Sequence, residues 1–280
     1  MRAEDQAEYW NRVAGPTWAA DQSLIDAAFR DYSHALLAHA NPRPGERVID
    51  VGCGCGTTTI AAARRCGFAT GLDISRPMLQ QARRLARAAA VAAEFLEVDA
   101  ASHRRQDGSI DLIISQFGLM FFDSPRQAFS NMFRWLSPGG RLVALCWQNA
   151  DNNPWLMLPG QVARAYVDVP TAHIEDSAIF SLGEAGSLVT LLVDAGFSEV
   201  RLKSIAYPLR VEGALERGFY FFVERAPLTS SLMSVDGATC DTALQALRDA
   251  IAVHHDGTGV ALTGAAWLVE AIRAASPAPR

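Results

Sequence analysis

Three glycines at alternate positions, Gly52, Gly54 and Gly56, follow a short apolar segment at residues 48–51. Glycine reaches positive φ, and because it has no Cβ a ligand can lie directly against the backbone. Residues 57–63 then have the composition of a helix start, where free N–H groups form an electropositive cradle. The pattern predicts a strand, a tight turn and a helix that together bind part of a nucleotide-like cofactor.

Acidic residues around this turn indicate which cofactor it binds. The glycine spacing G-x-G-x-G differs from the dinucleotide fingerprint G-x-G-x-x-G, and Asp50 would repel a pyrophosphate. A carboxylate there can instead order the loop and receive the ammonium group of an amino-acid-like ligand. Asp73 ends a second predicted strand, residues 69–73, where a carboxylate accepts hydrogen bonds from both ribose hydroxyls. A third predicted strand, residues 95–99, ends at Asp99.

Four motifs occur in order: DVGCGCG at 50–56, GLD at 71–73, VDA at 98–100 and SPGG at 137–140. Over residues 47–147 they resemble the class I S-adenosylmethionine-dependent methyltransferases, of a bacterial small-molecule type. The resemblance implies S-adenosylmethionine as cofactor and S-adenosylhomocysteine as product. It also implies a Rossmann-like α/β fold: a seven-stranded, mostly parallel sheet with its last strand antiparallel and helices on both faces. The cofactor residues that it implies are Asp50, Gly52, Cys53, Gly54, Gly56, Thr57, Asp73, Ile74, Met78, Asp99, Ala100, Ser115, Gln116 and Phe117.

The predicted domain organisation has two parts. Residues 1–40 are expected to form one short and one longer amphipathic helix, acting either as a staple on the domain or as a lid over the active site. Residues 41–280 form the methyltransferase domain, with insertions at about 148–186 and 211–259, the second a helical cap. Ser75 is the expected N-cap of a helix over residues 77–90. Further strands are predicted at 110–114, 141–147, 200–207 and 265–272.

Large rings and amides at or after the predicted strand ends are the candidate acceptor wall, because ligands of open α/β sheets bind outside the carboxyl ends of the strands. For Met120, and for Phe121 and Phe122 after it, a place in the core is the favoured alternative, and Asn153 could shape a turn. None of the six histidines sits in a motif, so the catalytic residues stay unknown. The predicted substrate-binding residues are Tyr9, Trp10, Trp18, Phe117, Met120, Trp147, Asn153, Trp155, Phe219 and Tyr220.

The amino-acid composition of the chain limits the kinds of binding partner to be expected. A net charge of −5 disfavours nucleic acid. The five cysteines are odd in number, and Cys53-x-Cys55 lacks the spacing of a zinc site, so neither disulfides nor a metal are expected. No apolar stretch reaches the 18 or so residues of a membrane span. We therefore expect a cytoplasmic bacterial protein with a small-molecule partner, whose oligomeric state is open and includes a homodimer.

The predicted reaction is metal-independent, in-line transfer of a methyl group to an oxygen, nitrogen or carbon of a small molecule. A quinone-like or lipid acceptor is an alternative within this class. Two alternatives lie outside it. An NAD-dependent oxidoreductase would share the strand, the glycine loop and Asp73, but not the glycine spacing. A non-catalytic S-adenosylmethionine-binding protein would keep all four motifs and have a blocked acceptor site.

Overall fold

The computed structural model describes residues 3–168, 178–224, 232 and 234–275. Within them one sheet of seven strands has the order β3-β2-β1-β4-β5-β7-β6. The pairs among β1 to β5 are parallel, whereas β7 runs antiparallel to both β5 and β6. This confirms the predicted fold. The strands are β1 (Val48–Val51), β2 (Ala69–Asp73), β3 (Ala93–Glu97), β4 (Ile110–Gln116), β5 (Leu136–Trp147), β6 (Ser198–Glu212) and β7 (Gly259–Ile272).

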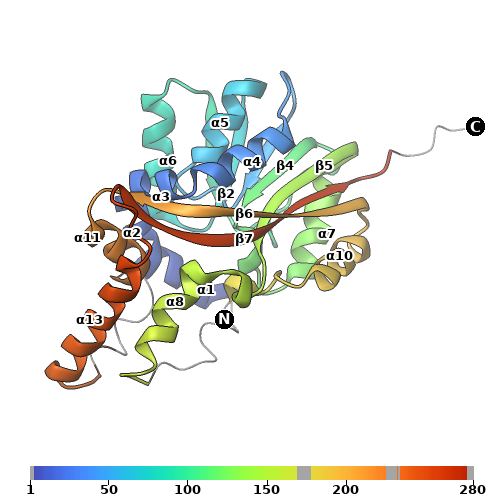
Figure 1. The fold of residues 1–280 in the computed structure, drawn as a ribbon. Coiled ribbons are helices and arrows are strands. Elements are labelled where there is room, and N and C mark those ends of the chain that lie inside the picture. The colour runs from blue at the N-terminus through green and yellow to red at the C-terminus, as the bar shows by residue number, and fades with distance from the viewer. Residues whose placement is uncertain (1–2, 169–177, 225–231, 233, 276–280) are drawn as a thin grey trace, which may run out of the picture.

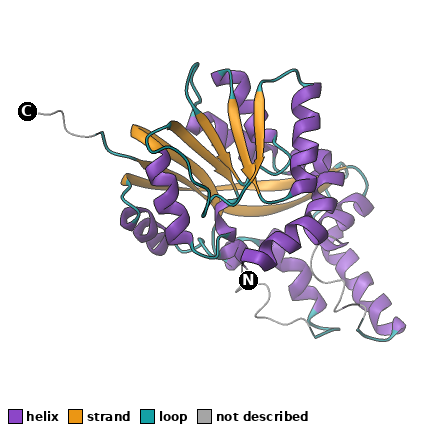
Figure 2. Cartoon of the chain, turned by 180° about the vertical axis from the view of Figure 1, so that it is seen from behind, coloured by secondary structure: helices purple, strands orange, loops and turns teal. Residues whose placement is uncertain are grey.

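Helices cover both faces of the sheet, as Figure 2 shows from behind. In Figure 1, α4, α5 and α6 lie on one side and α7 and α10 on the other, while α8 and α13 extend away from the sheet. The helical elements are α1 (Ala3–Glu8), η1 (Tyr9–Val13), α2 (Ala14–Ala20), α3 (Gln22–Ala28), α4 (Arg30–Ala40), α5 (Thr57–Cys66), α6 (Arg76–Ala88), η2 (Leu119–Phe121), α7 (Pro125–Trp135), η3 (Ala150–Asn152), α8 (Pro154–Ala163), η4 (Ala178–Phe180), α10 (Ala185–Asp194), α11 (Leu215–Phe219), η5 (Tyr220–Glu224) and α13 (Gly237–Ala252).

The central strands are largely apolar because both of their faces are covered. All four residues of β1 are buried, and Leu112, Ile113 and Ile114 of β4 are completely buried. Runs of this kind are typical of parallel strands between two helical layers. The hydrophobic core therefore sits on both sides of the middle of the sheet and fixes the strand ends that carry the site.

The strand boundaries differ from the sequence prediction. β5 begins at Leu136 rather than at residue 141, and β7 begins at Gly259 rather than at residue 265. β3 begins at Ala93 rather than at residue 95, because as an edge strand it exposes Glu94 and Glu97 and lacks an apolar run. β6 continues past residue 207 to Glu212. Pro208 falls within it, and a residue without an N–H is tolerated there because β6 is the other edge of the sheet.

The helical regions also differ from the prediction. The first 40 residues form four α-helices and one π-helical turn instead of two helices. The insertion at about 148–186 contains helix α8, which packs against β7 and α13. The predicted cap at 211–259 is helical in α11, η5 and α13, but its ends pair as the extension of β6 and β7. Residues 169–177, 225–231 and 233 of these insertions lie outside the described part of the chain.

Candidate active site

The glycine loop leaves β1 with its backbone held against β2. The N–H groups of Gly52 and Cys53 both donate to the carbonyl of Leu72, at 2.8 and 3.0 Å. Gly54 has a φ of +52°. A Cβ built on Gly54 would lie 2.8 Å from the terminal methyl group of Met78, which lines the same cavity. Glycine at position 54 therefore leaves a space between the loop backbone and α6 that a ligand can enter.

Asp50 lies beneath this loop and is completely buried. Its Oδ2 atom accepts hydrogen bonds from the hydroxyls of Thr58 and Thr59, at 2.6 and 2.7 Å. Its Oδ1 atom has no hydrogen-bond partner. Burial raises the pKa of the Asp50 carboxyl to about 6. The carboxylate ties the loop to the first turn of α5, which is one of its two predicted roles. It does not line the cavity. Its contact with an ammonium group of the ligand stays a prediction.

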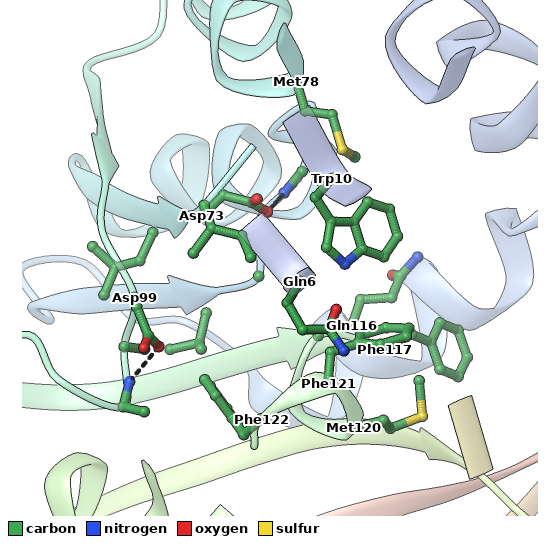
Figure 3. A pocket seen from close by; sticks show the side chains of 18 of the residues that line it. Gln6, Trp10, Asp73, Met78, Asp99, Gln116, Phe117, Met120, Phe121 and Phe122 are labelled. Carbon is green, nitrogen blue, oxygen red and sulfur yellow. Dashed lines mark hydrogen bonds between the residues drawn. The ribbon is translucent and has the colours of Figure 1, made fainter. Parts of the chain in front are cut away.

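Two further carboxylates stand where β2 and β3 end. Asp73 accepts the N–H of Gly54 on Oδ2 at 2.7 Å and the N–H of Ser75 on Oδ1 at 2.8 Å. Burial raises the pKa of Asp73, against the effect of these bonds. Asp99 accepts the N–H of Ala101 at 2.8 Å. Both side chains line the cavity (Figure 3), and each carboxylate oxygen has a second lone pair with which to accept a ligand hydrogen.

One cavity of about 580 Å³ connects these carboxylates with a group of aromatic side chains. Its size is in the range of small-molecule sites. Figure 3 shows Asp73 and Asp99 at one side and Phe117, Met120 and Phe121 at another, with Trp10 above them. The rings that line the cavity are Trp10, Trp18, Phe29, Phe117, Phe121, Phe122, Trp147 and Trp155.

Phe117 marks the junction between the two ends of the cavity. It follows β4 directly and has a φ of +59°, in the left-handed region that phenylalanine rarely adopts. Its ring stacks on Trp147 with a centroid distance of 4.0 Å and an angle of 8° between the planes. Strained backbone of this kind concentrates at functional sites. The left-handed backbone conformation places the Phe117 ring against β5, where the ring forms part of the cavity wall instead of filling the cavity.

The N-terminal segment closes one side of the cavity and is fastened to the loop after β2. The Asn11 side chain donates to the carbonyl of Ile74 at 2.9 Å and accepts the N–H of Arg76 at 2.9 Å. The Ser75 hydroxyl donates to the carbonyl of Trp10 at 2.8 Å. Ser75 is the N-cap residue of α6, as predicted, but among the described residues its side chain makes no capping hydrogen bond to the helix.

Most of the residues predicted for the site meet at this cavity. The predicted cofactor residues that line it are Gly52, Gly54, Asp73, Ile74, Met78, Asp99, Ala100, Gln116 and Phe117. The predicted acceptor residues that line it are Trp10, Trp18, Phe117, Met120, Trp147 and Trp155. Met120, for which core and wall were both open, is buried and at the same time part of the wall. Their roles in binding stay predictions.

The remaining predicted cofactor residues support the loop from outside the cavity wall. Thr57 exchanges hydrogen bonds with Gln22 and Asp26 of α3, at 2.9 and 2.7 Å. The Ser115 hydroxyl donates to the carbonyl of Val51 at 2.7 Å. Like Asp50, these side chains fix the backbone of the site. The others of this group are Cys53 and Gly56, which pack beside Phe95 or Gly71.

Four predicted acceptor residues also lie outside the wall. Tyr9 is 40% exposed. Asn153 is buried and binds backbone groups at Gln148, Asn149 and Ala265, so it shapes a turn, the other role open for it. The Tyr220 hydroxyl donates to Asp21 at 2.8 Å, and the Phe219 ring lies under the Arg248 guanidinium at 5.2 Å.

Several wall residues were not predicted from the sequence. Phe29 belongs to the apolar pattern of the predicted N-terminal helices and was assigned no role in the site, and Gln6 belongs to no motif. Phe121 and Phe122 follow Met120 and could have been included on adjacency. The wall residues missing from the prediction include Gln6, Ala7, Ile25, Phe29, Phe121, Phe122, Gln127 and Ile179.

Metal and histidine chemistry have no visible location in the part of the chain that the structure describes. No group of three or more His, Cys, Asp or Glu side chains there could hold a metal ion. None of the five histidines that the structure describes lines the cavity, and His173 lies outside the described residues. The titratable side chains of the wall are Asp73, Asp99 and Asp123.

The structural features above fit an adenosyl cofactor. Carboxylates at the ends of β2 and β3 suit hydroxyl and amino hydrogens, and the Gly54 backbone leaves a space that a Cβ would fill. A family model described as a methyltransferase domain matches residues 48–140. Together with the sheet order, this match shows that the chain carries a class I methyltransferase domain, which confirms the predicted family.

Comparison with known proteins agrees with this class. The chain is 31% identical over 148 residues to the ubiquinone/menaquinone biosynthesis C-methyltransferase UbiE of Ruegeria sp., covering 51% of this chain and 59% of that protein. The chain spans about half the length of the curated relatives that it matches first.

Solved structures share the fold at low identity. The YcgJ protein from Bacillus subtilis superposes with a TM-score of 0.59 at 16% identity, over 88% of this chain and all of that one. Phosphoethanolamine N-methyltransferase 2 from Haemonchus contortus, in complex with S-adenosyl-L-methionine, gives a TM-score of 0.58 at 16% identity, over 91% of this chain and 57% of that one. In the described residues, no helix combines the length and the apolar character needed to cross a membrane.

Proposed function

We propose that this protein transfers the methyl group of S-adenosylmethionine to a small-molecule acceptor without a metal. The observation that carries the proposal is the single cavity that joins the glycine loop, Asp73 and Asp99 to a wall of aromatic rings. A cofactor site and an acceptor site in one enclosed space are what direct group transfer requires. The methyltransferase-domain match supports this reading over the NAD-dependent alternative.

The cofactor end of the cavity would hold the adenosyl group through the strand-end carboxylates. Asp73 would accept the ribose hydroxyls, with Ile74 and Met78 as apolar neighbours of the base, and Asp99 with Ala100 would receive the adenine amino group. When bound, S-adenosylmethionine supplies a methyl group on a positively charged sulfur, which becomes a neutral thioether as the methyl leaves. Gln116 ends β4 and Phe117 follows it, at the junction with the acceptor end.

The contribution of the protein is alignment and exclusion of water. Holding two reactants in line can contribute about 7–11 kcal/mol to lowering the barrier. The stacked pair Phe117 and Trp147 gives the acceptor a rigid wall. The wall contains no described histidine, so a proton from the acceptor would pass to Asp123 or water.

Residues 1–40 act as a lid in this proposal rather than as a staple alone. Gln6, Trp10 and Trp18 line the cavity, so the segment shields the reacting groups from water. The hydrogen bonds from Asn11 and Ser75 fasten the lid to the loop that follows Asp73. Cofactor binding and lid closure would therefore stabilise each other.

Among acceptors, a quinone-like ring is the finer candidate. The relative from Ruegeria is named for ubiquinone and menaquinone biosynthesis, and the aromatic wall of this chain suits a flat apolar ring. The net charge of −5 supports a site of action away from nucleic acid. We further propose a cytoplasmic location in a bacterium.

The experiment is calorimetric titration with S-adenosylmethionine, S-adenosylhomocysteine and NADH, for the wild type and for Asp73→Ala. We expect both sulfur compounds to bind the wild type and the variant to lose at least about tenfold in affinity, as expected for a hydrogen bond to a charged group. Asp241→Ala, on the exposed side of α13, is the control. Binding of NADH alone would overturn the proposal. Tight cofactor binding with no methylated product from an extract of small molecules would favour the non-catalytic alternative.

A further inference from the structure

The acceptor end of the cavity has no positive side chain among the described residues. The described part of its wall contains neither Lys, Arg nor His, and the three charged residues there are all acids. Asp73 and Asp99 stand at the cofactor end, and Asp123 is exposed. Phosphate and carboxylate groups are bound in proteins by Arg or Lys side chains. Burial of an unpaired anion is strongly unfavourable, so this cavity selects against a phosphorylated or acidic acceptor.

Two amide oxygens in the same wall lack a hydrogen-bond partner. Gln6 is 5% exposed, and its Oε1 atom is buried and unpartnered; the same holds for the Oε1 atom of Gln116. Gln6 comes from α1 of the N-terminal segment and Gln116 from the end of β4. Figure 3 shows both side chains in the middle of the cavity, between Trp10 and Phe117.

A purely structural role does not account for Gln6. Buried polar atoms are almost always paired, and one left without a partner destabilises the protein. Its Oε1 atom accepts no hydrogen bond from the described chain, whereas a methionine of similar shape would fill the same space without an unpaired polar atom. A site that a ligand completes explains why the oxygen is left unpaired in the protein alone.

We propose, building on the proposed methyl transfer, that the acceptor is an uncharged, largely apolar ring compound bearing a hydroxyl or N–H group, and that Gln6 and Gln116 accept hydrogen bonds from it. The rings around the two amides supply the apolar contacts, and the amides supply orientation. Gln6 lies on the lid, so the hydroxyl or N–H group of the methyl acceptor can donate to Gln6 only when the lid is docked. Gln6 is thereby a specificity-determining residue.

Three probes with one ring system test this proposal: naphthalene, naphthol and naphthyl phosphate. Their affinities are measured by quenching of tryptophan fluorescence, with and without saturating S-adenosylhomocysteine. We expect naphthol to bind about tenfold more tightly than naphthalene, the effect of one neutral hydrogen bond donated by its single hydroxyl. Naphthyl phosphate should bind more weakly than naphthalene.

The decisive variant is Gln6→Met, with Gln245→Met on the exposed face of α13 as its control. Gln6→Met should reduce the preference for naphthol over naphthalene severalfold, because only the Gln116 oxygen can then accept the hydroxyl hydrogen. The variant should also melt at a higher temperature than the wild type without ligand. The control should keep the wild-type preference for naphthol. A lower melting temperature with the preference retained would show a structural role for Gln6.

Tightest binding of naphthyl phosphate, or no binding of any probe, would overturn the proposed acceptor class. The proposed methyl transfer fails separately, if S-adenosylhomocysteine does not bind in calorimetry. The probe preference is measured without that compound as well, so the two failures are distinguishable.

Discussion

Asp50→Asn should make the ligand-free protein more stable at neutral pH, although Asp50 is the acid of the glycine-loop motif. The carboxyl is completely buried. An asparagine oxygen can still accept from the hydroxyls of Thr58 and Thr59, which the Oδ2 atom now binds. The substitution therefore removes the buried charge and keeps the contacts that order the loop.

The size of the effect follows from the pKa of the carboxyl. Burial raises that pKa from 3.8 to about 6. Each pKa unit corresponds to about 1.36 kcal/mol, so ionisation inside the folded protein costs about 3 kcal/mol. Between these two pKa values the folded state binds more protons than the unfolded state. The free energy of unfolding of the wild type therefore falls as pH rises through this window and stays lower above it.

The assay is urea denaturation of the wild type and of Asp50→Asn at about pH 5 and about pH 8. The stability advantage of the variant should be larger at the higher pH by about 1.5 kcal/mol, because part of the ionisation cost is already present at the lower pH. Asp241→Asn, at an exposed position, should show no pH-dependent difference from the wild type.

An advantage of Asp50→Asn that is equal at both pH values, or that falls as pH rises, would refute this reasoning. It would mean that the carboxyl ionises without cost in the folded protein, and that burial is offset by the two threonine hydroxyls. A loss of S-adenosylmethionine binding in a stable variant would add that the charge serves the cofactor.

Two further predictions concern close backbone contact and the lid. Gly118→Ala should destabilise the protein by about 1–3 kcal/mol in urea denaturation, because its Cβ would lie 2.7 Å from the carbonyl oxygen of Val51. The control is Gly237→Ala, where nothing lies within 4 Å of the added Cβ, and it should stabilise α13 by about 0.5–1 kcal/mol. Equal effects of the two substitutions would contradict the packing argument. Asn11→Ala should speed amide hydrogen exchange across residues 6–15 and weaken S-adenosylhomocysteine binding severalfold, because it removes both hydrogen bonds to the loop at residues 74–76. Unchanged exchange would show that the aromatic side chains of the segment hold it in place.

The central strands and the cofactor loop could be predicted from sequence because their signals are local. An apolar run, alternate glycines and a strand-final acid are all contained within a few residues, as at Gly52, Gly54 and Asp73. The edge strands β3 and β6 were predicted less well. Their length depends on pairing with a neighbour distant in sequence, and their exposed faces carry charges that blur the hydrophobic pattern.

The acceptor wall could be predicted only in part, because large aromatic residues serve as core and as cavity lining alike. Trp147 and Trp155 were identified from their positions near a strand end. Phe29 also lines the cavity, but the sequence showed it only as part of the apolar pattern of a predicted helix. Asn153 was predicted for the wall from its position near a strand end, but it makes turn contacts instead. Its hydrogen bond to Ala265, which is distant in the chain, could not be foreseen.

The sequence by itself determined the class of this protein: local glycine and carboxylate motifs, in a fixed order along buried strands, predict one fold and one kind of cofactor loop. Only the tertiary structure decided which side chains meet. It buries Asp50 under the loop, ties Asn11 to the loop after β2, and leaves the amide oxygens of Gln6 and Gln116 unpaired in one cavity. These outcomes depend on contacts between segments far apart in the chain, which short-range residue patterns do not encode.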